Sequence, residues 1–161
     1  LPVAANDVEH LPFREQSIDL VYVHDGLHHL EDPAIGLQEM CRVASWAVSL
    51  TEPADAALTG LAVKLGRAEE IEEAGNRVAR LDLPTVTRIL ESEGFTVVRA
   101  QRYAMYYKHK PGWGMRLLSL PVLNSLAWLT FDVGNFLIGR WGNKMTVQAI
   151  RTEHPNDHPT P

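Results

Sequence analysis

The stretch that decides the fold is residues 7–30, which read DVEHLPF, REQS, IDLVYV and HDGLHHL in succession. The run Ile18–Val23 is short, apolar and rich in β-branched side chains, which is typical of a strand buried in a parallel sheet. His24 and Asp25 follow directly and are predicted to lie at the carboxyl end of this strand. Ligands of open α/β sheets bind at that end of the strands, so we expect a functional site at this turn.

Further elements of an α/β chain follow this strand. Asp32 and Pro33 predict the start of a helix, because Asp caps a helix well and Pro fits its first position. An apolar face at helical spacing supports that helix, and its members are Leu37, Met40, Cys41 and Ala44. The other predicted elements are strands at Trp46–Leu50, Phe95–Tyr103 and Lys144–Ile150, and helices at 54–79 and Pro84–Glu93.

These segments resemble the S-adenosylmethionine-dependent methyltransferases with a Rossmann-like fold, in particular the ubiquinone/menaquinone-biosynthesis type. Members of that family carry an Asp-Ala-Glu-x-Leu-Pro-Phe-like loop, a Phe-Asp-x-Val-like strand and a Leu-His-His-Leu-like turn. An Arg-Val pair before the next strand and an acidic-Pro pair after it complete the pattern. The matching segments here are Asp7–Phe13, Ile18–Val21, Leu27–Leu30, Arg42-Val43 and Glu52-Pro53.

The resemblance implies a partial Rossmann-like α/β fold over residues 1–152, with a mostly parallel sheet and an antiparallel last strand. The family's strand order is 3-2-1-4-5-7-6, of which this chain is expected to keep the block 4-5-7-6. The family's Gly-x-Gly-x-Gly loop and ribose-binding acid are not in the expected place, and the chain starts at Leu1. We therefore expect the C-terminal part of a methyltransferase, beginning at the end of the third strand, with residues 153–161 a disordered tail.

The resemblance also implies residues for S-adenosylmethionine. Asp7 would accept a hydrogen bond from the adenine amino group, and the backbone N–H of Val8 would face the ring. The alternative for Asp7 is a loop residue that caps local backbone. His24 would lie beside the methionine part of the cofactor, or would contribute its backbone only.

The acceptor side is predicted from position along the strands. Asp25 and Glu52 follow two neighbouring strands, and His24 and Asp25 are the candidates for a catalytic role. Glu52 would orient an acceptor hydroxyl or cap the next helix. An aromatic group near the sixth strand would line a pocket or simply pack, and it comprises Tyr103, Tyr106, Tyr107 and His109.

A metal site is the weaker interpretation of the histidine pair at this turn. His28 and His29 lie near Asp25 and Glu31 in the sequence, but their spacing matches no strong zinc pattern. We therefore expect no metal.

Residues 111–143 form an insertion where family members have a short turn. Leu117–Phe131 is uncharged, and aromatic residues such as Trp128 add bulk. A membrane span needs about 20 apolar residues, whereas this run is shorter, contains Pro121 and is bounded by Arg116 and Asp132. The sequence therefore favours a helical lid that binds the acceptor through Trp128, or an oligomer contact, over a span.

Composition bounds the function. The net charge of −5 disfavours nucleic acid as a partner, and the single Cys41 suits a reducing cytoplasm. We expect methyl transfer to a small-molecule or lipid acceptor, with peripheral membrane contact or a homo-oligomer as open questions. The alternative is a non-catalytic interaction domain that binds a partner or a membrane surface through the insertion.

Overall fold

The computed structural model describes residues 6–54, 81–105 and 113–152. The first part holds β1 (Ile18–His24), a short 3-10 turn (Leu27–His29), α1 (Pro33–Val43) and β2 (Ala44–Pro53). The rest holds α3 (Leu83–Ser92), β3 (Phe95–Tyr103), α4 (Trp113–Leu118), α5 (Pro121–Ile138), a 3-10 turn (Gly139–Trp141) and β4 (Lys144–Arg151). Of the predicted helix at 54–79 only Ala54 is described, and it forms an isolated parallel bridge with Leu81 instead of helix. The residues Tyr106, Tyr107 and His109 and the predicted tail lie outside the described residues.

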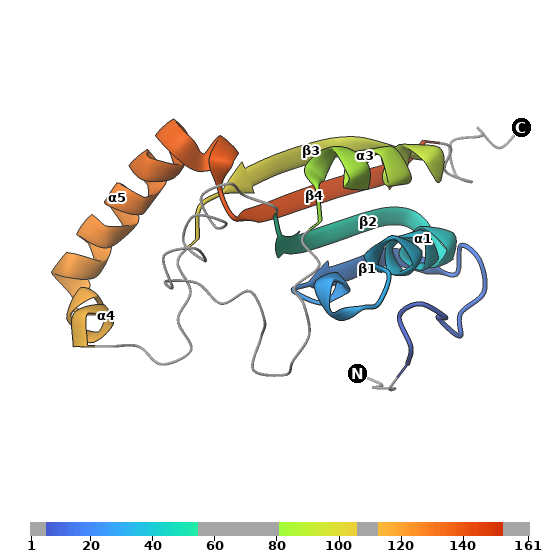
Figure 1. The fold of residues 1–161 in the computed structure, drawn as a ribbon, viewed down its shortest axis with the longest axis horizontal. Coiled ribbons are helices and arrows are strands. Elements are labelled where there is room, and N and C mark those ends of the chain that lie inside the picture. The colour runs from blue at the N-terminus through green and yellow to red at the C-terminus, as the bar shows by residue number, and fades with distance from the viewer. Residues whose placement is uncertain (1–5, 55–80, 106–112, 153–161) are drawn as a thin grey trace, which may run out of the picture.

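The four strands form one open mixed sheet in the order β1-β2-β4-β3. β1 pairs with β2 in parallel, and β4 pairs antiparallel with both β2 and β3. Figure 1 shows β1, β2 and β3 pointing toward the end of the sheet where α5 stands, while β4 runs back. This order confirms the predicted block 4-5-7-6 with its antiparallel last strand.

The core lies on the face of the sheet that α1 and α3 cover. Alternate residues of β4 (Met145, Val147 and Ala149) are buried there, and Thr146 and Gln148 face the other way. Leu37, Met40 and Cys41 of α1 join this core, as their spacing predicted. Buried residues recur at every second position of β4 and at every third or fourth position of α1, so each element has one buried face.

Side chains fix the ends of these helices. Asp32 accepts a hydrogen bond from the Ala34 N–H at 2.9 Å, as predicted, and Asp82 caps α3 through the Thr85 N–H at 3.2 Å. Arg151 of β4 donates to the carbonyls of Cys41 and Ala44, both at 2.8 Å, where α1 ends. A cation at a helix C-terminus satisfies carbonyls that have no partner inside the helix.

The insertion is helical in its described part, which confirms that prediction. The argument against a span from its length was wrong, because Pro121 begins α5 and Asp132 lies within it instead of ending it. The segment Pro121–Trp141 has 21 residues and is long and apolar enough to cross a membrane by length and composition alone, with almost none of it buried inside the protein.

Two asparagines hold the insertion to the sheet. The Asn135 side chain accepts from the Ala104 N–H at 2.6 Å and donates to the Ala104 carbonyl at 3.2 Å. Asn143 does the same for Met105, at 2.8 and 3.0 Å. Each amide thus replaces a neighbouring strand for one residue just past β3, so the C-terminal half of α5 is fixed against the end of the sheet.

Candidate functional site

The turn after β1 lies at the carboxyl end of the parallel strands. Asp25 has φ 51°, in the left-handed region that Asp tolerates better than most residues. Its backbone N–H donates to the Thr51 carbonyl of β2 at 2.8 Å. The chain therefore turns away from the sheet at Asp25 while staying attached to β2.

Glu52 anchors this turn from β2. Its carboxylate accepts the backbone N–H groups of Gly26 at 2.8 Å and Leu27 at 2.9 Å, and it pairs with His28 Nδ1 at 2.7 Å. The Glu52 side chain has 0% of its surface exposed. Among the described residues, Glu52 caps the short 3-10 turn that follows β1. The two predicted roles, orienting an acceptor hydroxyl and capping the next helix, did not include this one.

The ionised form of Glu52 is stabilised inside the protein. Burial raises the pKa of its carboxyl, but the hydrogen bonds from His28, Gly26 and Leu27 more than offset burial and hold the pKa below its usual value of 4.5. Glu52 is therefore an anion at neutral pH, whose charge is used to hold the backbone of the turn.

Lys144 reaches the same turn from the start of β4. Its ammonium forms an ion pair with Asp25, and the Lys144 side chain is 13% exposed. The other Asp25 oxygen lies 3.5 Å from Nε2 of the exposed His24. Sequence reasoning missed Lys144, because it lies 119 residues away from Asp25. The available signal was its place as the first residue of a strand antiparallel to its neighbours, which brings it to their carboxyl ends.

A second pair of side chains positions the loop that carries Asp7. Arg42 donates to the carbonyls of Leu11 and Phe13, both at 2.9 Å, and to Glu39. Glu39 in turn accepts the Leu11 N–H at 3.0 Å. The Arg42 guanidinium is the main reason that the pKa of Glu39 lies below its usual value. Arg42 thus holds the loop against α1, which gives the Arg-Val pair of the family pattern a physical reason.

Asp7 and Val8 lie at the N-terminal end of that loop. Asp7 Oδ1 accepts the Glu9 N–H at 3.0 Å, and Oδ2 lies 3.4 Å from His10. Val8 packs its side chain against the core, and none of the described residues accepts a hydrogen bond from its backbone N–H. Asp7 thus shows the predicted local capping and keeps an exposed carboxylate acceptor next to the N–H donor of Val8.

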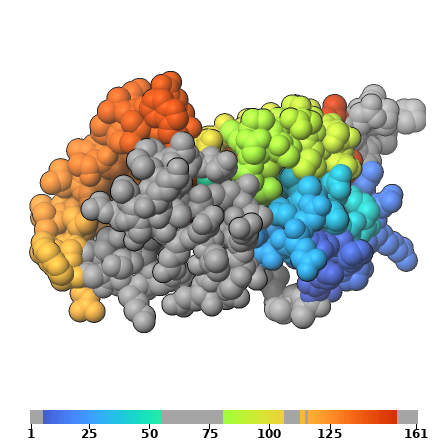
Figure 2. Space-filling view, viewed as in Figure 1, coloured from blue at the N-terminus to red at the C-terminus, as the bar shows by residue number. Residues whose placement is uncertain are grey.

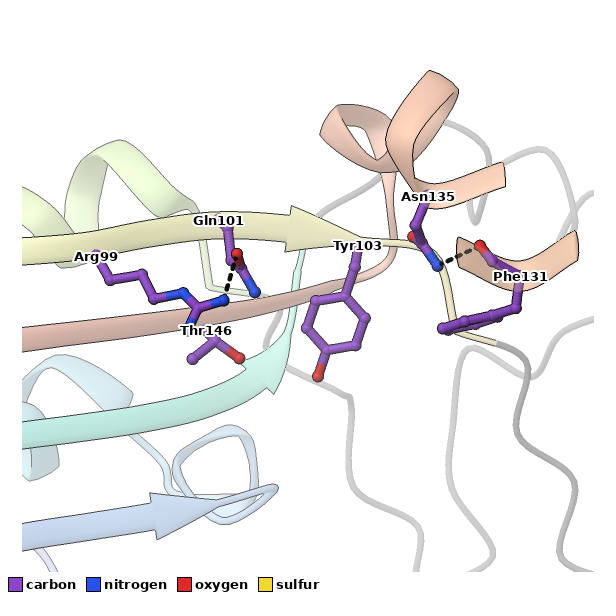
Figure 3. Close-up of a pocket in the computed structure, with 6 residues that line it drawn as sticks. All are labelled: Arg99, Gln101, Tyr103, Phe131, Asn135 and Thr146. Carbon is purple, nitrogen blue, oxygen red and sulfur yellow. Dashed lines mark hydrogen bonds between the residues drawn. The ribbon is translucent and has the colours of Figure 1, made fainter. Parts of the chain in front are cut away.

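A groove of about 420 Å³ lies between the open face of the sheet and α5. Figure 3 shows Arg99, Gln101 and Tyr103 one after another along β3, with Phe131 and Asn135 of α5 past the end of the strand, beyond Tyr103. Thr146 of β4 completes the lining. Tyr103 therefore lines a groove, as one of the two predictions for the aromatic group expected, while Tyr106 lies outside the described residues.

The groove is connected to the turn through β2. The hydroxyls of Thr146 and Thr51 lie 3.0 Å apart, and the Thr51 carbonyl accepts the Asp25 N–H. Since β1, β2 and β4 are successive strands about 4.8 Å apart, the groove's edge at Thr146 and the turn are separated by roughly 10 Å. One extended ligand or two adjoining ones would span that distance.

Trp128 sits beyond the groove. It is 58% exposed, and its ring is nearly perpendicular to that of Phe131, with the centroids 5.7 Å apart. Because Phe131 lines the groove, Trp128 supports the groove wall from outside. The N-terminal half of α5 extends away from the sheet in Figure 1, so α5 covers the site only around Phe131 and Asn135.

Asp25, His28 and Glu52 bring one potential metal ligand each to within 4.8 Å of one another. Asp25 is paired with Lys144, and Glu52 is paired with His28 and with backbone N–H groups. Protein donors thus already engage the carboxylates of this cluster, and its charges explain its geometry without a cation.

A family model described as "Methyltransferase domain" matches residues 1–45, which include the Asp7 loop and the turn after β1. No curated protein matches the sequence significantly. Among solved structures, a putative methyltransferase from Bacillus halodurans C-125 is similar, with a TM-score of 0.57 and 14% identity over 91% of this chain and 75% of that one.

Magnesium protoporphyrin IX methyltransferase from Synechocystis PCC 6803, solved with bound SAH, has a TM-score of 0.55 and 15% identity over 91% of this chain. The [4+2]-cyclase SpnF has a TM-score of 0.52 and 13% identity over 92% of this chain. The chain spans about half of these two structures, 49% and 54%. At such low identity the likeness concerns the fold alone, and the chain has the α/β fold of the Rossmann-like methyltransferases.

Proposed function

We propose that this chain is part of an S-adenosylmethionine-dependent methyltransferase that acts on a lipophilic small molecule. One observation carries the proposal: the segment that matches the methyltransferase domain contributes both the Asp7 loop and the His24-Asp25 turn to a sheet of methyltransferase order. The Glu9 carboxylate accepts the Asp32 N–H at 3.0 Å, which ties that loop to the start of α1, just past the turn. Both predicted cofactor segments therefore belong to the carboxyl end of β1.

On the cofactor side, the residues of this chain bind and orient. Asp7 accepts from the adenine amino group and Val8 donates its N–H to the ring, while His24 lies beside the methionine part. The bound cofactor supplies an electrophilic methyl group on a sulfonium. Glu52, Arg42 and Lys144 keep the two loops in place, because each holds backbone or a carboxylate of these loops through charged hydrogen bonds.

On the acceptor side, the groove beneath Tyr103 and Phe131 takes the acceptor. Its walls combine aromatic rings with the polar ends of Arg99, Gln101 and Asn135, which suits a mostly apolar molecule with one polar end. The exposed His24 and the partly buried Asp25 are the candidates to take a proton if the acceptor is a hydroxyl. The resemblance to the ubiquinone/menaquinone type extends the proposal to a phenolic or quinol-like acceptor.

The fold also serves other chemistry, as the [4+2]-cyclase SpnF shows. A cofactor titration of the full-length protein is therefore the decisive test. We expect S-adenosylhomocysteine to bind in calorimetry. Asp7→Ala should weaken binding by about 1–3 kcal/mol, because the adenine amino group loses its acceptor.

Asp19→Ala is the matched control, because it makes the same change at an exposed residue near the other end of β1. This variant should bind like the wild type. If the full-length protein does not bind the cofactor, the methyltransferase proposal is wrong and the interaction-domain alternative gains. If the wild type binds and Asp7→Ala binds equally well, Asp7 is a turn residue only.

A further inference from the structure

The outward face of α5 is an apolar surface that no described residue covers. None of the described residues of α5 is buried. Five of its apolar side chains recur at spacings of four, three, four and three residues and form one stripe, and each is at least half exposed: Val122, Leu126, Leu129, Val133 and Phe136. We call these five residues the outer stripe. Helical geometry puts them on the side of α5 opposite Phe131 and the groove.

The charge of the insertion differs from that of the remaining chain. Residues 111–143 hold two basic residues, Arg116 and Arg140, and the single acidic residue Asp132, a net charge of +1. The remaining chain carries −6, since the total is −5. An apolar stripe beside basic residues on an otherwise acidic protein is complementary to the surface of an anionic lipid bilayer.

The aromatic residues of the insertion are placed as at a membrane interface. Trp113 precedes α5, Trp141 follows it, and the Arg140 guanidinium lies 3.9 Å from the centroid of the Trp141 ring. Trp and Arg at both ends of an apolar segment are typical of interfacial anchors. Figure 2 shows α4 and α5 on the surface at one end of the molecule, apart from α1 and α3.

We propose that the outer stripe of α5 lies in the surface of an anionic lipid bilayer, parallel to its plane. Asp132 sits in the middle of α5, where a spanning helix would bring it to the bilayer centre. The insertion also leaves and rejoins the same end of the sheet, at Tyr103 and Lys144. A span would therefore need the connection between Tyr103 and Pro121, whose sequence includes Lys108, Lys110 and Arg116, to cross back through hydrocarbon.

A second copy of the chain fits the outer stripe less well than a lipid bilayer does. The outer stripe covers two heptads, which is short for a stable coiled coil. Packing two copies through α5 would also bring together two insertions of the same charge, +1 each.

The test is flotation of the purified protein with lipid vesicles in the absence of cofactor and acceptor, so its result is independent of the methyltransferase proposal. We expect binding to vesicles of phosphatidylcholine with phosphatidylglycerol, and much weaker binding to phosphatidylcholine alone or at high salt. Val133→Asp should reduce binding by at least about tenfold, because it puts a charge on the outer stripe. Arg116→Ala should reduce it by about fivefold on anionic vesicles only.

Val98→Asp is the matched control. Val98 lies on β3 and is exposed to a similar degree, 57% against 50% for Val133. This variant should float like the wild type. No binding to either vesicle, or an equal loss in both variants, overturns the proposal. Self-association in solution that Val133→Asp abolishes, without vesicle binding, also overturns it and identifies a second copy as the occupant.

Depth is measured by fluorescence. Three of the four tryptophans, Trp113, Trp128 and Trp141, belong to the insertion, and Trp46 is the fourth. In a variant with Trp46, Trp113 and Trp141 changed to Phe, we expect Trp128 emission to shift blue on vesicles. Lipids brominated near the headgroup should quench it more than lipids brominated near the chain end. Preferential quenching from the bilayer centre would show a span and overturn the in-plane arrangement.

Discussion

Glu52 shows how one buried side chain shapes the functional end of the sheet. It gathers the N–H groups of Gly26 and Leu27 and the ring of His28 on one carboxylate, so the turn after β1 has one well-defined course. Leaving such donors unsatisfied costs about 1–3 kcal/mol each, which exceeds what an exposed contact contributes. The acidic-Pro pair of the sequence pattern therefore serves the turn from a distance, and the exposed residues of the site depend on it.

We expect Glu52→Gln to lower the free energy of unfolding by about 1–3 kcal/mol near neutral pH, because the N–H donors of the turn lose a charged acceptor and an amide NH₂ replaces the oxygen that faces His28. The pKa of Glu52 lies below its usual 4.5 in the folded protein. Its stabilising contribution is thus fully present above that value and is lost as the pH falls through the folded pKa. Urea unfolding at several pH values should show the difference from wild type shrinking in acid.

The control for this prediction is Glu91→Gln, which makes the same change at an exposed residue of α3. It should leave the unfolding curve nearly unchanged across the same pH range. Equal stability of Glu52→Gln and wild type near neutral pH would contradict the assigned role of Glu52.

Cys41 illustrates the opposite effect of burial. Desolvation raises the pKa of its thiol to about 12, and the side chain lies in the core under α1. The thiolate is the reactive form, so iodoacetamide should leave the folded protein unmodified near neutral pH and alkylate it fully in denaturant. Mass spectrometry measures this. Since the folded pKa is raised, this contribution to stability is present below the ordinary thiol pKa and is lost as the pH rises toward 12. Rapid alkylation of the folded protein would contradict it.

At the scale of elements, the two edges of the sheet differ. β1 is the edge that sequence reasoning expected, and it exposes Leu20 and Tyr22. β3 is the other edge among the described strands, but it has an irregular register at Val97–Arg99 and carries Arg99 and Arg102. A regular apolar edge favours pairing with another chain, while bulges and charges discourage it.

We therefore expect this chain to self-associate through β1 as its concentration rises. Leu20→Lys should reduce the association measured by light scattering, because it adds charge to that edge at a half-exposed position. The matched change Val98→Lys on β3 should have little effect. A wild-type chain that stays monomeric at high concentration would show that β1 is not a free edge in solution.

The elements themselves were largely predictable, because their signals are local. The strand Ile18–Val23 and the cap Asp32 follow from a β-branched run and from an Asp-Pro pair, and the structure has both. The length of α5 is not predictable in this way, since Asp132 ends the uncharged run in the sequence but not the helix. One charged residue does not end a helix when the residues that follow it also favour the helical conformation.

The position of the site in the fold could be predicted from the sequence, but the contacts between its residues could not. The carboxyl end of β1 follows from the strand pattern, whereas the ion pair of Lys144 with Asp25 depends on the antiparallel return of β4. In the same way, the sequence indicates that Glu52 follows β2 but not which groups it binds. Hydrogen bonds between strands produce no periodic pattern in the sequence.

At the scale of the whole molecule, two features meet at one end of the sheet. The groove between β3 and α5 lies on the sheet side of α5, and the outer stripe lies on the other side. A single helix therefore connects the proposed acceptor site to the proposed membrane surface.

Trp128 tests whether α5 belongs to the acceptor site as well as to the surface. Its ring packs nearly perpendicular to that of Phe131, a wall of the groove. Aromatic pairs of this kind contribute about 0.5–1.5 kcal/mol beyond their buried area. In the full-length protein, Trp128→Ala should thus raise the KM for a short-chain hydroquinone about two- to tenfold, with kcat and the affinity for S-adenosylhomocysteine unchanged.

Phe136→Ala is the matched aromatic control, because Phe136 lies on the outer stripe and is 89% exposed. It should leave the KM for this soluble acceptor unchanged and weaken vesicle binding instead. The opposite division, in which Trp128→Ala loses vesicle binding and keeps a normal KM, would remove α5 from the acceptor site. The insertion would then be an interaction surface only, and the acceptor would have to bind on the side of His24 and Asp25.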